Sequence, residues 1–139
     1  MIKKVMFFGL AISAFNAFAG EFAITCYSTN LDPKVCSESL SDVVTERFTK
    51  SYPVSQYQLV EISDASEAGV SFASIGVAKR PKVDGQVVFP VNRVTASGYI
   101  KDLKESDRKP LEIETLRKAA QWLMEACDKA LDCDLGLKR

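Results

Sequence analysis

Residues 57–94 read YQLVEISDASEAGVSFASIGVAKRPKVDGQVVFPVNRV, and two runs within this stretch have the composition of β-strands. Residues 57–62 and 70–78 are rich in β-branched and aromatic side chains, which fit a pleated and half-buried surface. A polar turn separates the two runs. The alternation of the second run slips just before Gly76, which predicts a β-bulge or a close approach of another backbone at that point.

The end of the same stretch carries a hairpin signal. Asp84-Gly85 lies between two strand-like runs, and both residues tolerate the positive φ that a tight hairpin turn requires. This pair predicts a strand over 86–94 that is antiparallel to the run before it. Pro90 cannot donate a hydrogen bond to a ladder, so it places this strand at a sheet edge or interrupts it. Residues 95–100 can continue the strand beyond such an interruption.

Two amphipathic helices flank the strands. Asp32 followed by Pro33 is a typical helix start, and apolar residues at helical spacing extend the first helix over 33–50. A longer apolar stripe predicts the second helix over 111–131, after a charged surface loop at 101–109.

Alternating residues at 22–27 add a short first strand, so the predicted order of elements is β-α-β-β-β-α. Consecutive strands joined by a hairpin indicate an antiparallel sheet, and two amphipathic helices can cover one of its faces. The predicted fold class is therefore α+β, with about four antiparallel strands and two helices in a two-layer sandwich. This arrangement forms a single domain at residues 20–139.

The first nineteen residues have the features of a cleaved signal peptide. Lys3 and Lys4 form a basic start, residues 5–15 form an apolar stretch, and the small-x-small pattern at 17–19 predicts cleavage after Ala19. The apolar stretch is shorter than the roughly 20 residues that a membrane-spanning helix needs, which disfavours a transmembrane anchor. A short leader of this kind is typical of bacteria and predicts export to the periplasm or secretion.

The composition is that of an ordinary globular chain, with 139 residues of which 47% are hydrophobic and 26% charged. Eighteen basic residues balance eighteen acidic ones, and loss of the leader leaves 16 against 18, a formal charge of −2. This balance provides no global field that would attract nucleic acid or an anionic membrane. The chain has no histidine, which excludes Ser/His and Cys/His nucleophiles, His-ligated metals and an imidazole pH switch.

Four cysteines follow the leader, and an even count in an oxidising compartment predicts two disulfides. The short separations favour pairing of Cys26 with Cys36 and of Cys127 with Cys133, although the two long-range connectivities stay open. The spacing does not match a zinc ribbon or knuckle, and the chain lacks a Cys-x-x-Cys redox motif. The sequence therefore predicts no metal and no cofactor.

The sequence contains no phosphate loop, dinucleotide fingerprint, nucleophile elbow or acidic calcium loop. Two carboxylates that the fold brings together could still catalyse hydrolysis, and sequence spacing does not reveal such a pair. A chain of this size has little material for a deep substrate cleft. The sequence therefore favours a binding protein over an enzyme and assigns no catalytic residue.

Five side chains are candidates for contact with a partner. Arg47 falls on the apolar stripe of the first helix, where its head either reaches water at the rim or is offered to a partner's carboxylate. Trp122 lies away from the stripe of the second helix, so it can anchor an interface unless a loop or a second protomer covers it. Lys79, Arg80 and Lys82 make the hairpin tip basic, either as solvated surface or as a contact for an acidic cleft.

The combination of an export signal, disulfides and a small α+β domain predicts a protein that acts by binding. The leading hypothesis is a periplasmic protein-binding module, an inhibitor or immunity protein that blocks a toxin or an envelope-targeting hydrolase. The second is a structural or assembly adaptor of the bacterial envelope, which would bind through a sheet edge such as the one at Pro90. The third is a small carboxylate-dependent hydrolase. Neither nucleic acid nor a membrane is expected as a partner after leader cleavage, and a homodimer stays open.

Overall fold

The computed structural model describes residues 21–129 of the chain. One sheet contains four strands in the order β1-β2-β3-β4. The strands are β1 (Ile24–Ser28), β2 (Tyr57–Ala65), β3 (Val70–Lys79) and β4 (Val94–Tyr99). The helices are α1 (Pro33–Leu40), α2 (Glu46–Ser51), the 3-10 helix η1 (Glu105–Asp107) and α3 (Arg108–Lys129).

The α+β fold class is confirmed, but the sheet is mixed and not purely antiparallel. β2, β3 and β4 are antiparallel neighbours, whereas β1 runs parallel to β2. Residues 29–56 contain α1 and α2. A helical crossover of this length carries the chain back to the starting end of the sheet, so the next strand runs parallel to the first. The antiparallel prediction for the first strand was wrong because that crossover separates β1 from β2 in the sequence.

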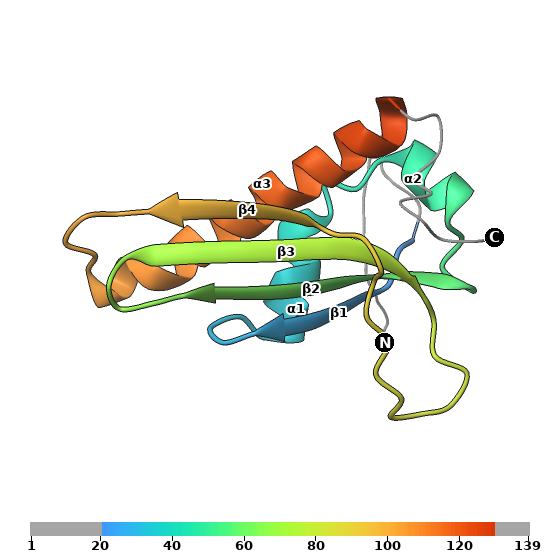
Figure 1. Ribbon diagram of the computed structural model, residues 1–139, viewed down its shortest axis with the longest axis horizontal. Coiled ribbons are helices and arrows are strands. Elements are labelled where there is room, and N and C mark those ends of the chain that lie inside the picture. Colours follow the sequence, from blue (N-terminus) through green and yellow to red (C-terminus); the bar gives the residue numbers. More distant parts are fainter. Residues whose placement is uncertain (1–20, 130–139) are drawn as a thin grey trace, which may run out of the picture.

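The helices lie on one face of the sheet, so the predicted two layers are present (Figure 1). α3 is the long element of the helical layer, and it contacts β2, β3 and β4. The largest fully buried apolar side chains between the layers are those of Leu40, Leu59, Ile75, Leu116 and Leu123. We call this side of the sheet the inner face and the opposite side the outer face.

The helix predicted over 33–50 is two helices. Its start is confirmed, since the Asp32 side chain accepts a hydrogen bond from the Val35 amide and caps α1. The helix ends after Leu40, and a new helix begins where the Thr45 hydroxyl accepts a hydrogen bond from the backbone amide three residues later. A side-chain cap satisfies an amide that lacks a partner in the first helical turn, so Thr45 starts α2 independently.

The strand predicted over 86–94 is absent, and Asp84-Gly85 does not join two paired strands. Residues 80–93 form an irregular connection instead, and the fourth strand is β4, which begins at Val94 and otherwise lies in the region 95–100 predicted as a continuation. The register of β3 is continuous, so it contains no bulge. The predicted close approach at Gly76 is confirmed, because an added Cβ there would lie 2.7 Å from Pro90 Cβ and 2.5 Å from the Asn92 carbonyl oxygen.

The predicted C-terminal helix is confirmed as α3, with a start three residues earlier than expected. Pro110 lies in the first turn, where its missing N–H has no intrahelical partner to lose. The charged loop predicted over 101–109 is partly helical, because it contains η1 and the start of α3. Within residues 21–129, no helix combines the length and the apolar character that a membrane crossing requires.

The Cys26–Cys36 disulfide is confirmed, and it joins β1 to α1. Cys127 is disulfide-bonded as well, but Cys133, its predicted partner, lies outside the described residues. The predicted signal peptide at 1–19 also lies outside them.

Candidate functional site

A carboxyl group is buried at the middle of β2, beneath the helical layer. Glu61 shares the inner face with Leu59 and Ser63, because side chains alternate between the two faces along a strand. Its side chain is fully buried. In the sheet register, Glu61 is paired with Cys26 on β1 and with Ile75 on β3. The carboxyl group therefore lies between the disulfide and the hydrophobic core.

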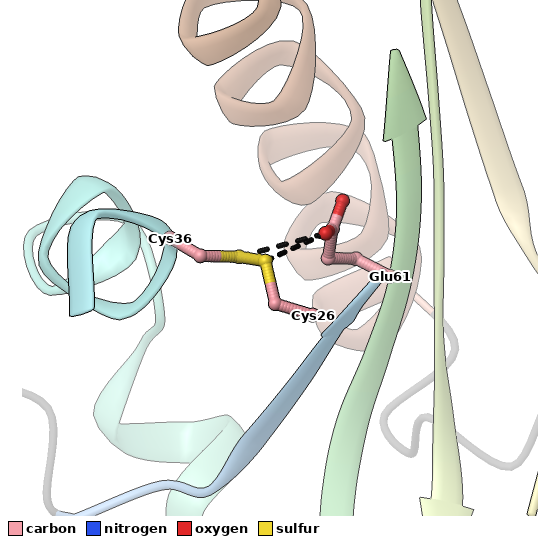
Figure 2. A group of neighbouring side chains, drawn as sticks. All are labelled: Cys26, Cys36 and Glu61. Carbon is pink, nitrogen blue, oxygen red and sulfur yellow. Dashed lines mark hydrogen bonds between the residues drawn. A yellow bond between two sulfur atoms is a disulfide. The ribbon is translucent and has the colours of Figure 1, made fainter. Parts of the chain in front are cut away.

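Glu61 contacts both sulfur atoms of the disulfide (Figure 2). Its Oε1 atom lies 2.7 Å from Cys26 Sγ and 3.6 Å from Cys36 Sγ. The sulfur atoms of a disulfide carry no proton, so the only hydrogen available for the short contact is that of a neutral carboxyl group. The geometry therefore fits a Glu61 O–H that donates to Cys26 Sγ.

The environment of Glu61 favours this neutral form. Burial raises the pKa of Glu61 to about 7, and the negative charge of Glu112 contributes to the increase. The neighbouring Ser63 side chain and the Tyr27 backbone limit this increase. Within the described part of the chain, the second carboxyl oxygen, Oε2, is buried without a hydrogen-bond partner. An unpaired buried oxygen costs free energy, so Glu61 does not have the environment of a carboxylate that stabilises the fold.

A second buried carboxyl group, Glu112, has the opposite environment. It lies in the first turns of α3 and is fully buried. Oε2 accepts hydrogen bonds from the hydroxyls of Ser28 and of Ser63, the latter at 2.7 Å, and Oε1 accepts one from the Asn30 amide at 2.7 Å. The Ser28 hydroxyl in turn accepts from the Leu31 backbone amide at 2.8 Å. Glu112 therefore ties the start of α3 to the turn between β1 and α1.

Neither glutamate was singled out in the sequence, although both carry a recognisable signal. Glu61 lies two residues after Leu59 along β2, so its side chain is on the same, apolar face of the strand. Glu112 lies four residues before Leu116, in the apolar stripe of α3. An acidic residue at an apolar position of a strand or helix indicates a buried carboxyl group, and fully buried acidic groups are rare in proteins.

The sequence-predicted contact residues do not share one surface. Trp122 is 46% exposed on α3, so it points away from the core as predicted. Lys79 ends β3, and Lys82 lies exposed in the connection that follows. The Arg80 guanidinium donates to the Val54 carbonyl oxygen at 2.8 Å, which ties the base of that connection to the loop before β2.

The placement of Arg47 on an apolar stripe was wrong. Arg47 is exposed on α2. The break after Leu40 shifts the helical phase, so that Phe48 is the residue of α2 that enters the core. Arg47 therefore needs neither a long stem along the core nor a buried partner.

Residues 80–93 cross the outer face of the sheet, and we call this segment the strap. Pro90 packs over Gly76 on β3, and the Phe89 ring lies 5.6 Å from the ring of Tyr27 on β1. The strap thus spans the sheet from the third strand to the first. It also explains why Val60, which pairs with Gly76 and points away from the helices, is buried.

Exposed apolar side chains are concentrated on the strap and on the outer face beside it. Of the ten large hydrophobic residues that the described chain exposes, eight lie there, and only Ile100 and Trp122 lie elsewhere. We call these eight the outer apolar surface: Tyr27, Val70, Phe72, Val83, Val87, Phe89, Val91 and Tyr99.

Comparisons with models of protein families, with curated proteins and with solved structures find no match to this chain.

Proposed function

We propose that this chain is an exported protein-binding module that acts as an inhibitor or immunity protein by covering the active site of a toxin or an envelope-targeting hydrolase. The observation that supports the proposal is the outer apolar surface. Protein interfaces have an apolar and aromatic centre that excludes water, surrounded by a polar rim. Tyr27, Phe72 and Phe89 supply aromatic side chains, and they are 38%, 41% and 51% exposed.

The strap presents part of this surface in a fixed conformation. Pro90 packs against the sheet at Gly76, and the Phe89 ring contacts the Tyr27 ring in a tilted arrangement, so two consecutive residues of the strap are held against the sheet. A segment that is ordered before binding loses less conformational entropy when a partner covers it. The exposed basic residues Lys79 and Lys82 lie where the strap leaves β3, and there they favour a partner with an acidic cleft.

The interface can be tested by capture from the periplasmic extract of the source bacterium. The bait is the chain from residue 20, compared with a Phe72→Ser/Phe89→Ser variant and with a Trp122→Ala variant as the matched control. We expect the parent chain and Trp122→Ala to retain the same partner, and the double variant to lose it. The purified partner should then lose hydrolytic activity in proportion to the amount of chain added.

Other outcomes would contradict the proposal. Loss of the partner in Trp122→Ala alone would move the interface to α3, and a partner that keeps full activity would exclude inhibition. Sedimentation equilibrium of the parent chain adds a further check. A stable dimer that Phe89→Ser dissociates would show that the outer apolar surface serves self-association.

If the chain is an envelope adaptor, the sheet edge available for binding is β4 and not the edge expected at Pro90. Pro90 lies in the strap and not in a strand, so strand addition would use another edge of the sheet. β4 is an edge strand of six residues without a charged side chain or proline. Such an edge lacks the usual protection against pairing with another strand. A Thr95→Pro variant that abolishes capture would favour the adaptor over the inhibitor.

A further inference from the structure

The two sulfur atoms of the Cys26–Cys36 disulfide lie in different environments. Cys36 belongs to α1 and is fully buried, whereas Cys26 lies on the edge strand β1 and is partly exposed. In thiol–disulfide exchange an external thiolate attacks one sulfur and the other sulfur leaves as a thiolate. Cys26 is therefore the more accessible cysteine for attack by an external thiolate, and the buried Cys36 Sγ is the leaving group.

A buried leaving group needs a proton. A thiolate formed inside an apolar core has lost its hydration, which disfavours the charged form. Glu61 Oε1 lies within reach of both sulfur atoms, at 2.7 Å from Cys26 Sγ and 3.6 Å from Cys36 Sγ. The short contact fits a carboxyl group that carries the proton in the oxidised state. Within the described residues, the Oε2 atom has no hydrogen-bond partner, so no donor at that oxygen favours the ionised form.

Few other groups compete for this role in the described chain. β3 presents the apolar Ile75 to Glu61, β2 presents Ser63, and α1 presents Cys36 itself. From α3, Glu112 acts on Glu61 through its charge. Glu112 already accepts three hydrogen bonds, and its negative charge keeps the proton on Glu61.

We propose that Cys26–Cys36 is a redox-active disulfide that exchanges with a dithiol, and that Glu61 is the general acid that protonates the departing Cys36 sulfur. One thiolate of the dithiol attacks Cys26 Sγ, the bond to Cys36 Sγ breaks, and the Glu61 proton moves to Cys36 Sγ. The second thiol of the dithiol gives its proton to the Glu61 carboxylate and attacks the dithiol sulfur that is bonded to Cys26, so the bond between that sulfur and Cys26 Sγ breaks. Cys26 leaves with a proton from water. The dithiol is oxidised to a disulfide, the protein gains two electrons and two protons, and the reverse reaction uses the Glu61 carboxylate as the base.

The test follows reduction of the oxidised protein by dithiothreitol, with alkylation and peptide mass mapping to report Cys26 and Cys36 separately from Cys127. Rates are divided by the concentration of dithiothreitol thiolate at each pH. For the parent chain we expect this normalised rate to fall as the pH rises through neutrality, because Glu61 loses its proton. Glu61→Gln should be slower by about tenfold or more at acidic pH, with a flat profile. The matched control Glu114→Gln removes an exposed carboxylate of α3 and should behave as the parent chain.

Circular dichroism recorded during the reaction shows whether each chain is folded while it is reduced. Equal rates and equal pH profiles for Glu61→Gln and the parent chain would overturn the proposal. Reduction that occurs only at the rate of global unfolding would overturn it as well. If Glu61→Gln does not fold, Glu61→Asp provides the same test. The shorter side chain withdraws the acid from the sulfurs, so the rate should fall while a pH dependence remains.

Discussion

Glu61 is a carboxyl group that the fold keeps neutral, and this has a consequence for stability. Its pKa rises from an ordinary value of 4.5 to about 7 in the folded chain, because burial disfavours the charged form. Between these values the folded state holds a proton that the unfolded state has lost. The free energy of unfolding therefore falls as the pH rises, by about 3 kcal/mol across this range.

We expect Glu61→Gln to remove this loss, because the amide does not ionise. Urea unfolding of the oxidised chain at pH values below and above the interval measures the effect, with Glu114→Gln as an exposed control. The parent chain and the control should lose stability between the two pH values, and Glu61→Gln should lose much less. An unchanged pH dependence in Glu61→Gln would show that Glu61 is ionised in the folded protein.

Glu112 has a structural role as a hydrogen-bond acceptor, and substitutions that remove this acceptor test it. Glu112→Ala removes the acceptor of the Ser28 and Ser63 hydroxyls, of which Ser63 is buried, and one of the acceptors of the Asn30 amide. We expect the free energy of unfolding to fall by about 2–4 kcal/mol, since unpaired buried donors retain their desolvation cost. Glu112→Gln keeps one acceptor oxygen and should cost less. Equal losses in the two variants, measured by urea unfolding, would contradict this account.

At the scale of elements, the sequence predicts best those segments whose signals are local. β3 and α3 follow from their own periodicity, and α1 follows from its Asp32 cap. The second helix begins at a cap as well, but Thr45 stands among apolar residues that continue the helical spacing across the break. The break is stabilised from elsewhere in the chain, since Asp42 forms a bidentate ion pair with Arg117 of α3 at 2.7 and 3.0 Å.

The strap shows the same limit for a strand-like sequence. Residues 86–94 alternate as a strand does, but their apolar side chains lie across the outer face of the sheet and do not extend its ladder. What decides this is Gly76, because only a residue without a side chain lets Pro90 approach β3 so closely. Gly76 indicates in the sequence that another backbone segment approaches β3 closely. Which segment approaches depends on the tertiary fold.

Gly76→Ala is expected to displace the strap. The new methyl group would lie 2.5 Å from the Asn92 carbonyl oxygen and 2.7 Å from Pro90 Cβ, so the strap must move away from β3. We expect faster cleavage within 80–93 by a lysine- and arginine-specific protease, together with a loss of stability of about 1–3 kcal/mol. Gly85→Asn is the matched control, since an added Cβ there meets no atom and asparagine tolerates its positive φ of 81°. Equal cleavage of the two variants would show that Gly76 does not hold the strap.

At the scale of the whole molecule, the two faces of the sheet carry different groups of side chains. Its inner face holds the core, the disulfide and both buried glutamates, and its outer face holds the strap and most of the exposed apolar side chains. Composition and spacing anticipated the layers and the local disulfide. They did not anticipate either site, because the contact of Glu61 with the two cysteines depends on the parallel pairing of β1 with β2. That pairing joins residues 35 positions apart.

Two residues of β3 test whether the faces are energetically separate. Phe72 points outward and is 41% exposed, whereas Ile75 points inward and is fully buried. Ile75→Ala should lower the free energy of unfolding by about 2–5 kcal/mol, because it leaves a cavity in the core. Phe72→Ser should change it by no more than about 0.5 kcal/mol, as expected for a surface position, yet weaken capture of the partner. If urea unfolding shows that Phe72→Ser is as destabilising as Ile75→Ala, the outer apolar surface belongs to the folded core and is not a surface held open for another protein.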